Sequence, residues 1–373
     1  MVGMQHVVLV PGFMGFGNFG DLHYFLGARE ALQRAFTEGG ATVEVTEVDT
    51  NPTGSIRQRA AAVRETVARI GTGESVHLVG HSTGGIDARL AAAPVATLPG
   101  DPAEDAIRSL VTISTPHRGT PLADLLGSAF GKPLLALLAG LAFRILRRRR
   151  RSLQFVLKLG RLVTRVDDLF GQRDTVLDEI YRDLLSDFSE ERQEAIAGFM
   201  EAIASDQSLV FQLTTAGCDV FNACTATPEV PYGSVLTKSP TPRVAHLVRR
   251  NLYAASSHAV YALLYAAARR TGGSQNAVAR HVNDVVDARD RPIDPRDNDG
   301  IVPTRSQVWG EIVDVVDADH LDVVGHFGRD ASDPTSTGSS SVDWLPSGSS
   351  FDQARFEEMW ARIARFQLRA AKA

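Results

Sequence analysis

The stretch LVGHSTGGIDARL at residues 78–90 constrains the fold more than any other part of the chain. An apolar run at residues 75–80 precedes the pentapeptide Gly80-His81-Ser82-Thr83-Gly84, and a helical pattern at residues 84–93 follows it. This pentapeptide fits G-x-S-x-G, in which the glycines prevent collisions around a serine on a sharp strand-to-helix turn. The stretch therefore predicts a tight turn that presents Ser82 at a helix N-terminus, where developing negative charge is favoured. The alternative is a glycine-rich turn without chemistry.

Strands and helices alternate along the first third of the chain. Ser55 is placed to cap a helix that ends at Gly71. Apolar runs and alternation predict strands, and three- and four-residue apolar spacing predicts helices. The predicted strands are 6–10, 41–48, 75–80 and 107–114, and the predicted helices are 21–38, 55–70 and 84–93. Such alternation indicates an α/β fold with a mainly parallel sheet.

This alternation stops near residue 121, and the next 120 residues have mostly helical patterns. Residues 246–256 and 311–318 are predicted to return to the sheet, and residues 351–371 to form a final amphipathic helix. We therefore expect an α/β core interrupted once. Its expected parts are a first core segment at 1–120, a helical lid or cap at 121–243, and a second core segment at 244–373.

Composition excludes several classes of protein. A net charge of −5 gives no global electrostatic case for binding nucleic acid. Two cysteines, Cys218 and Cys224, make neither a disulfide framework nor a zinc-like spacing, although one bridge between them stays open. The N-terminus shows no charged and apolar leader, so we expect a cytoplasmic protein.

A reactive serine requires a histidine base that a carboxylate orients, and in this fold the order is serine, acid, histidine. Downstream, DNDGIVPT at 297–304 offers Asp299, with Asp297 and Asp294 as alternatives. DADHLDVVGHF at 317–327 offers His320, where a loop leaves a strand, and His326 is its rival. We expect Asp299 and His320 to act. The histidines expected to be structural or on the surface are His6, His23, His77, His117, His246, His258 and His281, while His81 is expected to point along the turn.

The loop VLVPGFMGFG at residues 8–17 follows the first predicted strand. Such a loop can aim a backbone N–H at the oxygen of a tetrahedral intermediate. We expect the N–H groups of Phe13 and Thr83 to form this oxyanion hole, although a glycine-rich surface turn is the alternative. Phe13, Met14, Leu134 and Leu138 are the expected substrate-binding residues.

Residues 125–165 combine an apolar stretch with a basic one. The apolar run at 125–143 is interrupted by Lys132-Pro133 and is too short for a confident membrane span. Residues 144–165 contain nine basic residues and no acidic ones. This pattern favours contact with an anionic lipid surface. A cap packed over the core is the alternative, and a nucleic-acid patch is less favoured because no aromatic residues interleave the run.

Together these motifs resemble bacterial triacylglycerol lipases of the Pseudomonas and Burkholderia type. The matching pieces occur in order over nearly the whole chain, and STPHRGT is the most specific. They are VLVPGFMGF, VHLVGHSTGG, LVTISTPHRGTPLAD (110–124), FNA (221–223), NDGIVP (298–303) and DHLDVV (319–324).

The resemblance implies the α/β-hydrolase fold with helices on both faces of the sheet and a helical lid. It implies Ser82 as nucleophile, Asp299 as acid, His320 as base, and oxyanion donors at Phe13 and Thr83. One departure is Pro11-Gly12, where those lipases usually have His-Gly.

Those lipases often hold a structural calcium ion. Asp322 matches one ligand position, but His326 replaces the glutamine expected next, and imidazole is a poor calcium ligand. We therefore expect no cofactor, with calcium near Asp322 left open.

The expected activity is hydrolysis of carboxylic esters of lipid-like substrates, such as acylglycerols, through an acyl-enzyme. The expected partners are a lipid or ester substrate and a membrane surface at 125–165, without nucleic acid. Two alternatives remain: an acyltransferase or polyester depolymerase with the same triad, and a non-catalytic lipid-binding protein.

Overall fold

A computed structural model describes most of the α/β core. The described residues are 4–13, 15, 23–71, 73–94, 98, 106–126, 206, 208–242, 252–269, 293–328, 343 and 345–372. Met14, Leu134, Leu138 and most of the expected lid and of residues 125–165 lie outside them.

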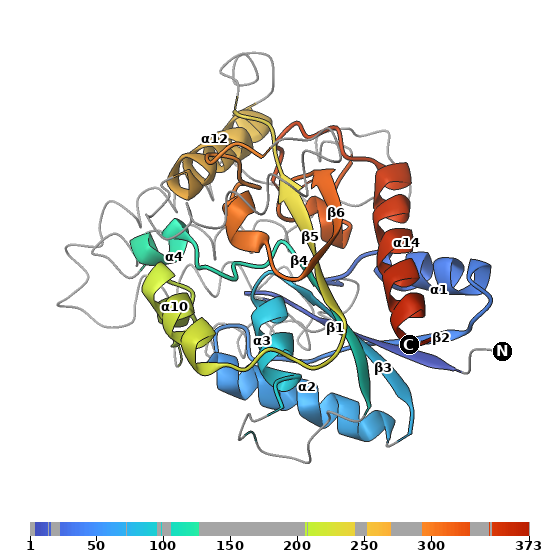
Figure 1. Ribbon diagram of the computed structural model, residues 1–373. Helices are drawn as coiled ribbons and strands as arrows, with labels where there is room; N and C mark the ends of the chain where they lie inside the picture. Colours follow the sequence, from blue (N-terminus) through green and yellow to red (C-terminus); the bar gives the residue numbers. More distant parts are fainter. Residues whose placement is uncertain are drawn as a thin grey trace, which may run out of the picture.

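Six parallel strands form the central sheet in the order β2-β1-β3-β4-β5-β6 (Figure 1). The chain goes from β1 to one side and then crosses back to β3, so the strand order reverses between β1 and β3. Ligands of open α/β sheets bind beyond the carboxyl ends of the strands at such a reversal. The strands are β1 (Gln5–Val10), β2 (Val43–Glu47), β3 (Ser75–His81), β4 (Ile107–Ile113), β5 (Tyr232–Lys238) and β6 (Glu311–Asp317).

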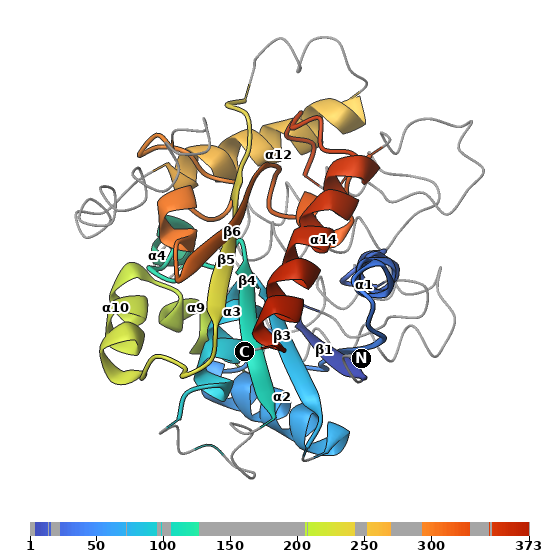
Figure 2. The same cartoon turned by 45° about the vertical axis from the view of Figure 1, so that its right-hand side comes forward.

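Helices cover both faces of the sheet, because successive side chains of each strand point to opposite faces. Val7 and Leu9 of β1 pack in one apolar cluster with α1 (Ala28–Glu38) and α14 (Gln353–Ala370). Figures 1 and 2 show these two helices next to each other. Val8 and Val10 face the other cluster, with α2 (Ile56–Ile70) and α3 (Thr83–Ala91). The core therefore lies in two layers, one on each side of β1.

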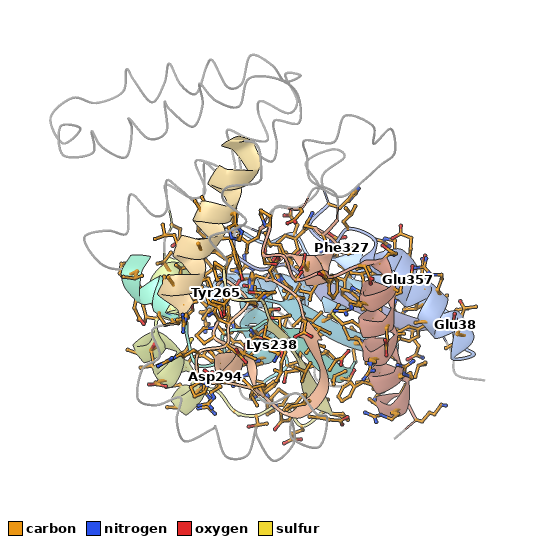
Figure 3. The ribbon with its side chains drawn as sticks, turned by 90° about the horizontal axis from the view of Figure 1, so that it is seen from above. Glu38, Lys238, Tyr265, Asp294, Phe327 and Glu357 are labelled. Atoms are coloured by element: carbon orange, nitrogen blue, oxygen red, sulfur yellow. The ribbon has the colours of Figure 1, made fainter. Side chains whose placement is uncertain are left out.

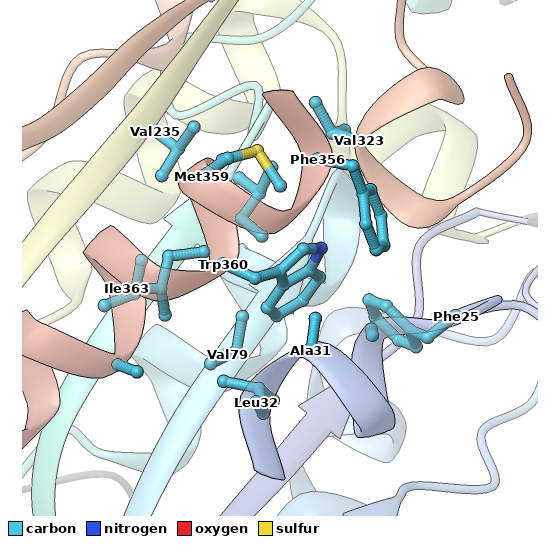
Figure 4. Packing of buried hydrophobic residues seen from close by; sticks show 14 of the residues in the cluster. Phe25, Ala31, Leu32, Val79, Val235, Val323, Phe356, Met359, Trp360 and Ile363 are labelled. Carbon is cyan, nitrogen blue, oxygen red and sulfur yellow. The ribbon is translucent and has the colours of Figure 1, made fainter. Parts of the chain in front are cut away.

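Trp360 of α14 is fully buried at the centre of the first layer. Figure 4 shows its ring above Ala31 and Leu32 of α1, with Phe25 beside it and Val79 of β3 beneath. Glu357 of α14, labelled in Figure 3, forms an exposed ion pair with Arg34 of α1. The buried surface, rather than this exposed ion pair, holds α14 on the sheet.

The boundaries of α2 agree with the sequence prediction. The side chain of Ser55 accepts a hydrogen bond from the Gln58 N–H, the Gln58 side-chain oxygen accepts one from the Ser55 N–H, and Gly71 ends the helix. This is a capping box, which satisfies two N–H groups that the first turn leaves without partners.

The predicted return of residues 246–256 to the sheet is wrong for residues 252–256, which are helical, while residues 246–251 lie outside the described residues. The strand after β4 is β5, Tyr232–Lys238, which lies inside the range expected to be a helical insertion. Leu252 begins helix α12, which extends to Ala268. The error arises because Tyr-Gly-Ser-Val-Leu-Thr-Lys has few large apolar residues, and its burial comes from strands on both sides. The limits of the lid stay predictions.

Shorter helices complete the described part of the chain: α4 (Pro121–Leu126), α9 (Ser208–Gln212), α10 (Thr215–Cys224) and the 3-10 helices η2 (Thr304–Gln307) and η3 (Asp322–Val324). In α10, Cys218 and Cys224 are both free, so the open bridge between them is absent. None of the helices within the described ranges is long and apolar enough to span a membrane.

His77 of β3 is a buried histidine whose charge state affects stability. Its Nδ1 lies 2.8 Å from Ser109 Oγ and its Nε2 lies 3.0 Å from Gln5 Oε1. Burial, and secondarily the Arg108 charge, lowers the pKa of His77 to about 4. The unfolded chain takes up a proton near pH 6.5 and the folded chain only near pH 4. The contribution of His77 to stability is therefore complete above pH 6.5 and is lost as the pH falls toward 4.

We expect His77→Gln to weaken this acid sensitivity. Between pH 7 and pH 4.5, the free energy of unfolding of the variant should fall by roughly 2 kcal/mol less than that of the wild type. Urea unfolding at both pH values measures the difference. Equal losses in the two proteins would contradict a neutral buried imidazole at position 77.

Candidate active site

Ser82 stands at the turn between β3 and α3, as the sequence predicts. Its φ of 53° and ψ of −128° lie outside the regions that L residues prefer, so the surroundings must enforce them. A Cβ on Gly80 would come within 2.4 Å of the Gly84 carbonyl oxygen, and one on Gly84 within 2.2 Å of the Val10 oxygen. Only glycine at both positions allows this turn to form against β1.

His320 connects Ser82 to Asp299. Its Nε2 lies 2.9 Å from Ser82 Oγ, and its Nδ1 lies 2.8 Å from Asp299 Oδ2. All three side chains are at least 95% buried in the protein. With Nδ1–H donating to the carboxylate, Nε2 is free to accept the Ser82 hydroxyl proton. The three residues predicted to act together are therefore in contact.

Asp299 is fully buried, and the protein compensates its charge with hydrogen bonds. The N–H groups of Ile301 and Val302 donate to Oδ1, at 3.0 and 2.8 Å. Thr237 Oγ1 and Gln307 Nε2 donate to Oδ2, at 2.7 and 3.2 Å. These donors hold the carboxylate against the His320 ring.

Asp299 is not positioned by a strand that directly precedes it. The described residues before it, 293–298, contain no strand, and Asp299 lies instead beside the end of β5. The Ser239 N–H, just past β5, donates to the carbonyl oxygen of Asn298 at 2.9 Å. The turn that carries Asp299 is thus held at the end of β5, a strand some 60 residues earlier in the sequence.

The alternative acids and base have other roles. The carboxylates of Asp294 and Asp297 accept backbone N–H groups within their own turn, and Asp297 also lies 3.9 Å from Lys238 Nζ. His326 follows η3, and its Nε2 lies 3.0 Å from the Tyr24 carbonyl oxygen. None of these groups is hydrogen-bonded to the Ser82–His320 pair.

The loop after β1 lies directly against Ser82. A Cβ on Gly12 would come within 2.7 Å of Ser82 Cβ. Phe13, the next residue, packs partly buried on the cluster that contains Ile86 of α3. Thr83 is the first residue of α3, where backbone N–H groups have no partners within the helix. The two expected oxyanion donors therefore flank the serine.

Arg59 of α2 fastens this loop, a contact that the sequence analysis missed. Its guanidinium donates to the carbonyl oxygens of Pro11 and Gly12, at 2.6 and 3.3 Å, and its Nε pairs with Asp87 at 2.8 Å. Both side chains are fully buried, and burial raises the pKa of Asp87 to about 6 against the opposing effect of Arg59. The signal was present, because Arg59 occupies the apolar face of α2 between Ile56 and Val63.

The calcium ion left open near Asp322 stays a prediction. Asp322 Oδ2 accepts the Asp319 N–H at 2.9 Å and the Ser349 hydroxyl at 2.7 Å. His326, at the position of the expected next ligand, is turned to the Tyr24 carbonyl. The part of the chain that the structure describes contains no group of three or more metal-ligating side chains. Burial raises the pKa of Asp322 to about 7.

The protein combines three features: a parallel sheet in the order β2-β1-β3-β4-β5-β6, a serine on a strained turn after β3, and a histidine after β6 that contacts this serine. The chain has the α/β-hydrolase fold. The family described as PGAP1-like alpha/beta domain matches residues 60–130, which include the serine turn.

Part of this chain is similar to triacylglycerol lipases. That of Pseudarthrobacter phenanthrenivorans is 35% identical over 124 residues, 32% of this chain and 35% of the relative. That of Burkholderia plantarii is 35% identical over 124 residues, 32% of this chain and 31% of the relative. That of Pseudomonas fragi is 33% identical over 126 residues, 33% of this chain and 39% of the relative. The matched part thus spans about a third of the length of these relatives.

Among solved structures, the lipase of Staphylococcus hyicus aligns with a TM-score of 0.49 at 15% identity, over 99% of this chain and 96% of that one. A metagenomic carboxyl esterase aligns with a TM-score of 0.48 at 16% identity, over 98% of this chain and 76% of that one.

Proposed function

We propose that this α/β hydrolase is a serine carboxylic ester hydrolase that acts on lipid-like esters. The proposal rests on two hydrogen bonds: His320 is bonded to both Ser82 and Asp299. Ser82 itself stands on a strained strand-to-helix turn. The similarity to triacylglycerol lipases supports the same reaction class and favours acylglycerols as substrates.

In the proposed reaction, Ser82 Oγ attacks the ester carbonyl while His320 Nε2 takes its proton. Asp299 keeps His320 in the tautomer with a proton on Nδ1 and balances the imidazolium charge. Backbone N–H groups of Phe13 and Thr83 stabilise the oxyanion, each worth on the order of 10²–10³ in rate. His320 then donates the proton to the leaving alkoxide, and water releases the acyl group with the same base.

The substrate surface in this proposal includes Phe13, Met14, Leu134 and Leu138. The segment 125–165 is proposed to contact a lipid surface through its apolar and basic residues. Phe13, the described member of the set, is partly buried and packs on the apolar cluster that contains Ile86 of α3 and Leu209 of α9.

A fluorophosphonate probe tests the nucleophile. We expect the intact chain to be labelled once, on the peptide that contains Ser82, and labelling to disappear in Ser82→Ala. Failure of the probe to react would favour a non-catalytic lipid-binding protein.

A panel of p-nitrophenyl esters from acetate to palmitate, with and without micelles, then defines the acyl length. Adding an alcohol as competing acceptor separates hydrolysis from acyl transfer. A product that is mainly the new ester would replace the hydrolase proposal by an acyltransferase with the same triad.

A further inference from the structure

Two buried side chains outside the triad connect the turns around Ser82. His81 is fully buried, with its Nε2 2.9 Å from the His320 carbonyl oxygen and its Nδ1 2.6 Å from the Tyr24 hydroxyl. A carbonyl oxygen only accepts, so the His81 proton is on Nε2 and Nδ1 accepts from the Tyr24 O–H. Gly12 lies against the Tyr24 hydroxyl, because a Cβ on Gly12 would come within 2.6 Å of that oxygen, and its backbone hydrogen-bonds the hydroxyl. A continuous set of hydrogen bonds thus runs from the loop after β1 to the loop after β6.

Tyr24 is itself fastened to the loop that carries His320. Its carbonyl oxygen accepts from His326 Nε2 at 3.0 Å, and the Leu26 N–H donates to the Val324 carbonyl at 2.9 Å. The hydroxyl of Tyr24 therefore has a defined position relative to the base. The loop after β1 contacts that hydroxyl at Gly12.

Few other hydrogen bonds attach residues 11–13 and 15, the described part of the loop after β1, to the rest of the protein. Pro11 has no N–H, and the carbonyl oxygens of Pro11 and Gly12 are both occupied by Arg59. Arg59 belongs to α2, so this attachment does not fix the position of the loop relative to His320. The contact between Gly12 and Tyr24 fixes that position.

His81 keeps its hydrogen bonds while His320 changes charge. The two imidazole rings are 4.8 Å apart between centroids, at an angle of 47°. Burial, and secondarily the neighbouring His320 charge, lowers the pKa of His81 well below its ordinary value. His81 thus stays neutral when His320 becomes an imidazolium, and its Nε2–H continues to donate to the His320 carbonyl.

We propose that Tyr24 and His81 form a hydrogen-bond relay that positions the oxyanion loop at Gly12 and the base His320 on either side of Ser82. The inference rests on the proposed ester hydrolysis and adds two positioning residues to it. Neither side chain touches the reacting atoms. A displacement of about 1 Å between catalytic groups costs on the order of 10²-fold in rate, which is the scale on which such a relay acts.

Tyr24→Phe removes the shared hydroxyl and little else. We expect kcat for p-nitrophenyl butyrate to fall about 10- to 100-fold while KM changes less than about threefold, because ground-state binding does not use the relay. The matched control is Tyr261→Phe, at a fully buried tyrosine whose hydroxyl contacts Ser239 and the Pro240 carbonyl. The control should keep kcat within about twofold of the wild type.

Position 81 provides a rescue experiment. Glutamine can place an amide N–H near the site of Nε2, whereas leucine cannot. We expect His81→Gln to retain about tenfold more kcat than His81→Leu. Equal activities, or a Tyr24→Phe variant that loses stability but not kcat, would overturn the relay.

A spectroscopic readout tests the relay without catalysis. In the full chain labelled with ¹⁵N-histidine, the His81 signal, assigned by its loss in His81→Gln, should show the neutral tautomer with a proton on Nε2. Tyr24→Phe should shift its Nδ1 resonance, and Tyr261→Phe should not. An unshifted Nδ1 overturns the relay even if the wild type proves inactive, whereas inactivity with the expected shift overturns only the proposed hydrolysis.

Discussion

Ser82→Ala should lower kcat for p-nitrophenyl ester hydrolysis roughly 10⁴- to 10⁶-fold, because no other hydroxyl is hydrogen-bonded to His320 Nε2 among the described residues. Stability should change by less than about 0.5 kcal/mol. Alanine keeps the Cβ, and the Ser82 side chain makes no capping hydrogen bond to α3. Steady-state kinetics and thermal unfolding of the same preparation separate the two effects.

Ser114 offers a matched control for this substitution. It is another buried serine with positive φ, 52°, and it follows β4, the neighbour of β3. Its hydroxyl contacts Thr237, so Ser114→Ala should cost less than about tenfold in kcat. Activity of Ser82→Ala within tenfold of the wild type would refute the assignment of the nucleophile.

His320→Ala should abolish activity to a similar extent, on the order of 10⁴-fold or more, because both the base and its link to Asp299 disappear. His326→Ala should cost far less kcat, no more than the roughly 10- to 100-fold expected of Tyr24→Phe, because His326 only fastens Tyr24. Its Nε2 donates to the Tyr24 carbonyl in a buried site, so its removal should cost stability instead, about 1–3 kcal/mol. Parallel measurement of kcat and urea unfolding for both variants makes the comparison.

The reverse pattern, with an active His320→Ala and an inactive His326→Ala, would exchange the two histidines. Loss of activity in both with loss of fold in His326→Ala would leave the base unassigned by kinetics. In that case the exclusive loss of fluorophosphonate labelling in folded His320→Ala identifies the base, because only the base activates Ser82.

Local sequence patterns predicted much of the fold. The strands on either side of Ser82, the helix α2 between Ser55 and Gly71, and α14 all lie within a few residues of their predicted ranges. Each depends on the period of the apolar residues and on end signals, which are properties of adjacent residues. β5 was not predicted, because it is buried only by its place between β4 and β6, which are distant in sequence.

Ser82, Asp299 and His320 could be named in advance because turn chemistry and chain order restrict where such residues stand. The partners that hold them could not be named. Thr237 lies 62 residues from Asp299, and His81 lies 239 residues from the His320 carbonyl that it contacts. A sequence pattern predicts that a polar group is buried, but three-dimensional packing selects which distant donor or acceptor compensates it. Local patterns therefore set most of the strands and helices and the serine turn, whereas long-range packing selected the hydrogen bonds that hold Asp299, His320 and the loop after β1 in place.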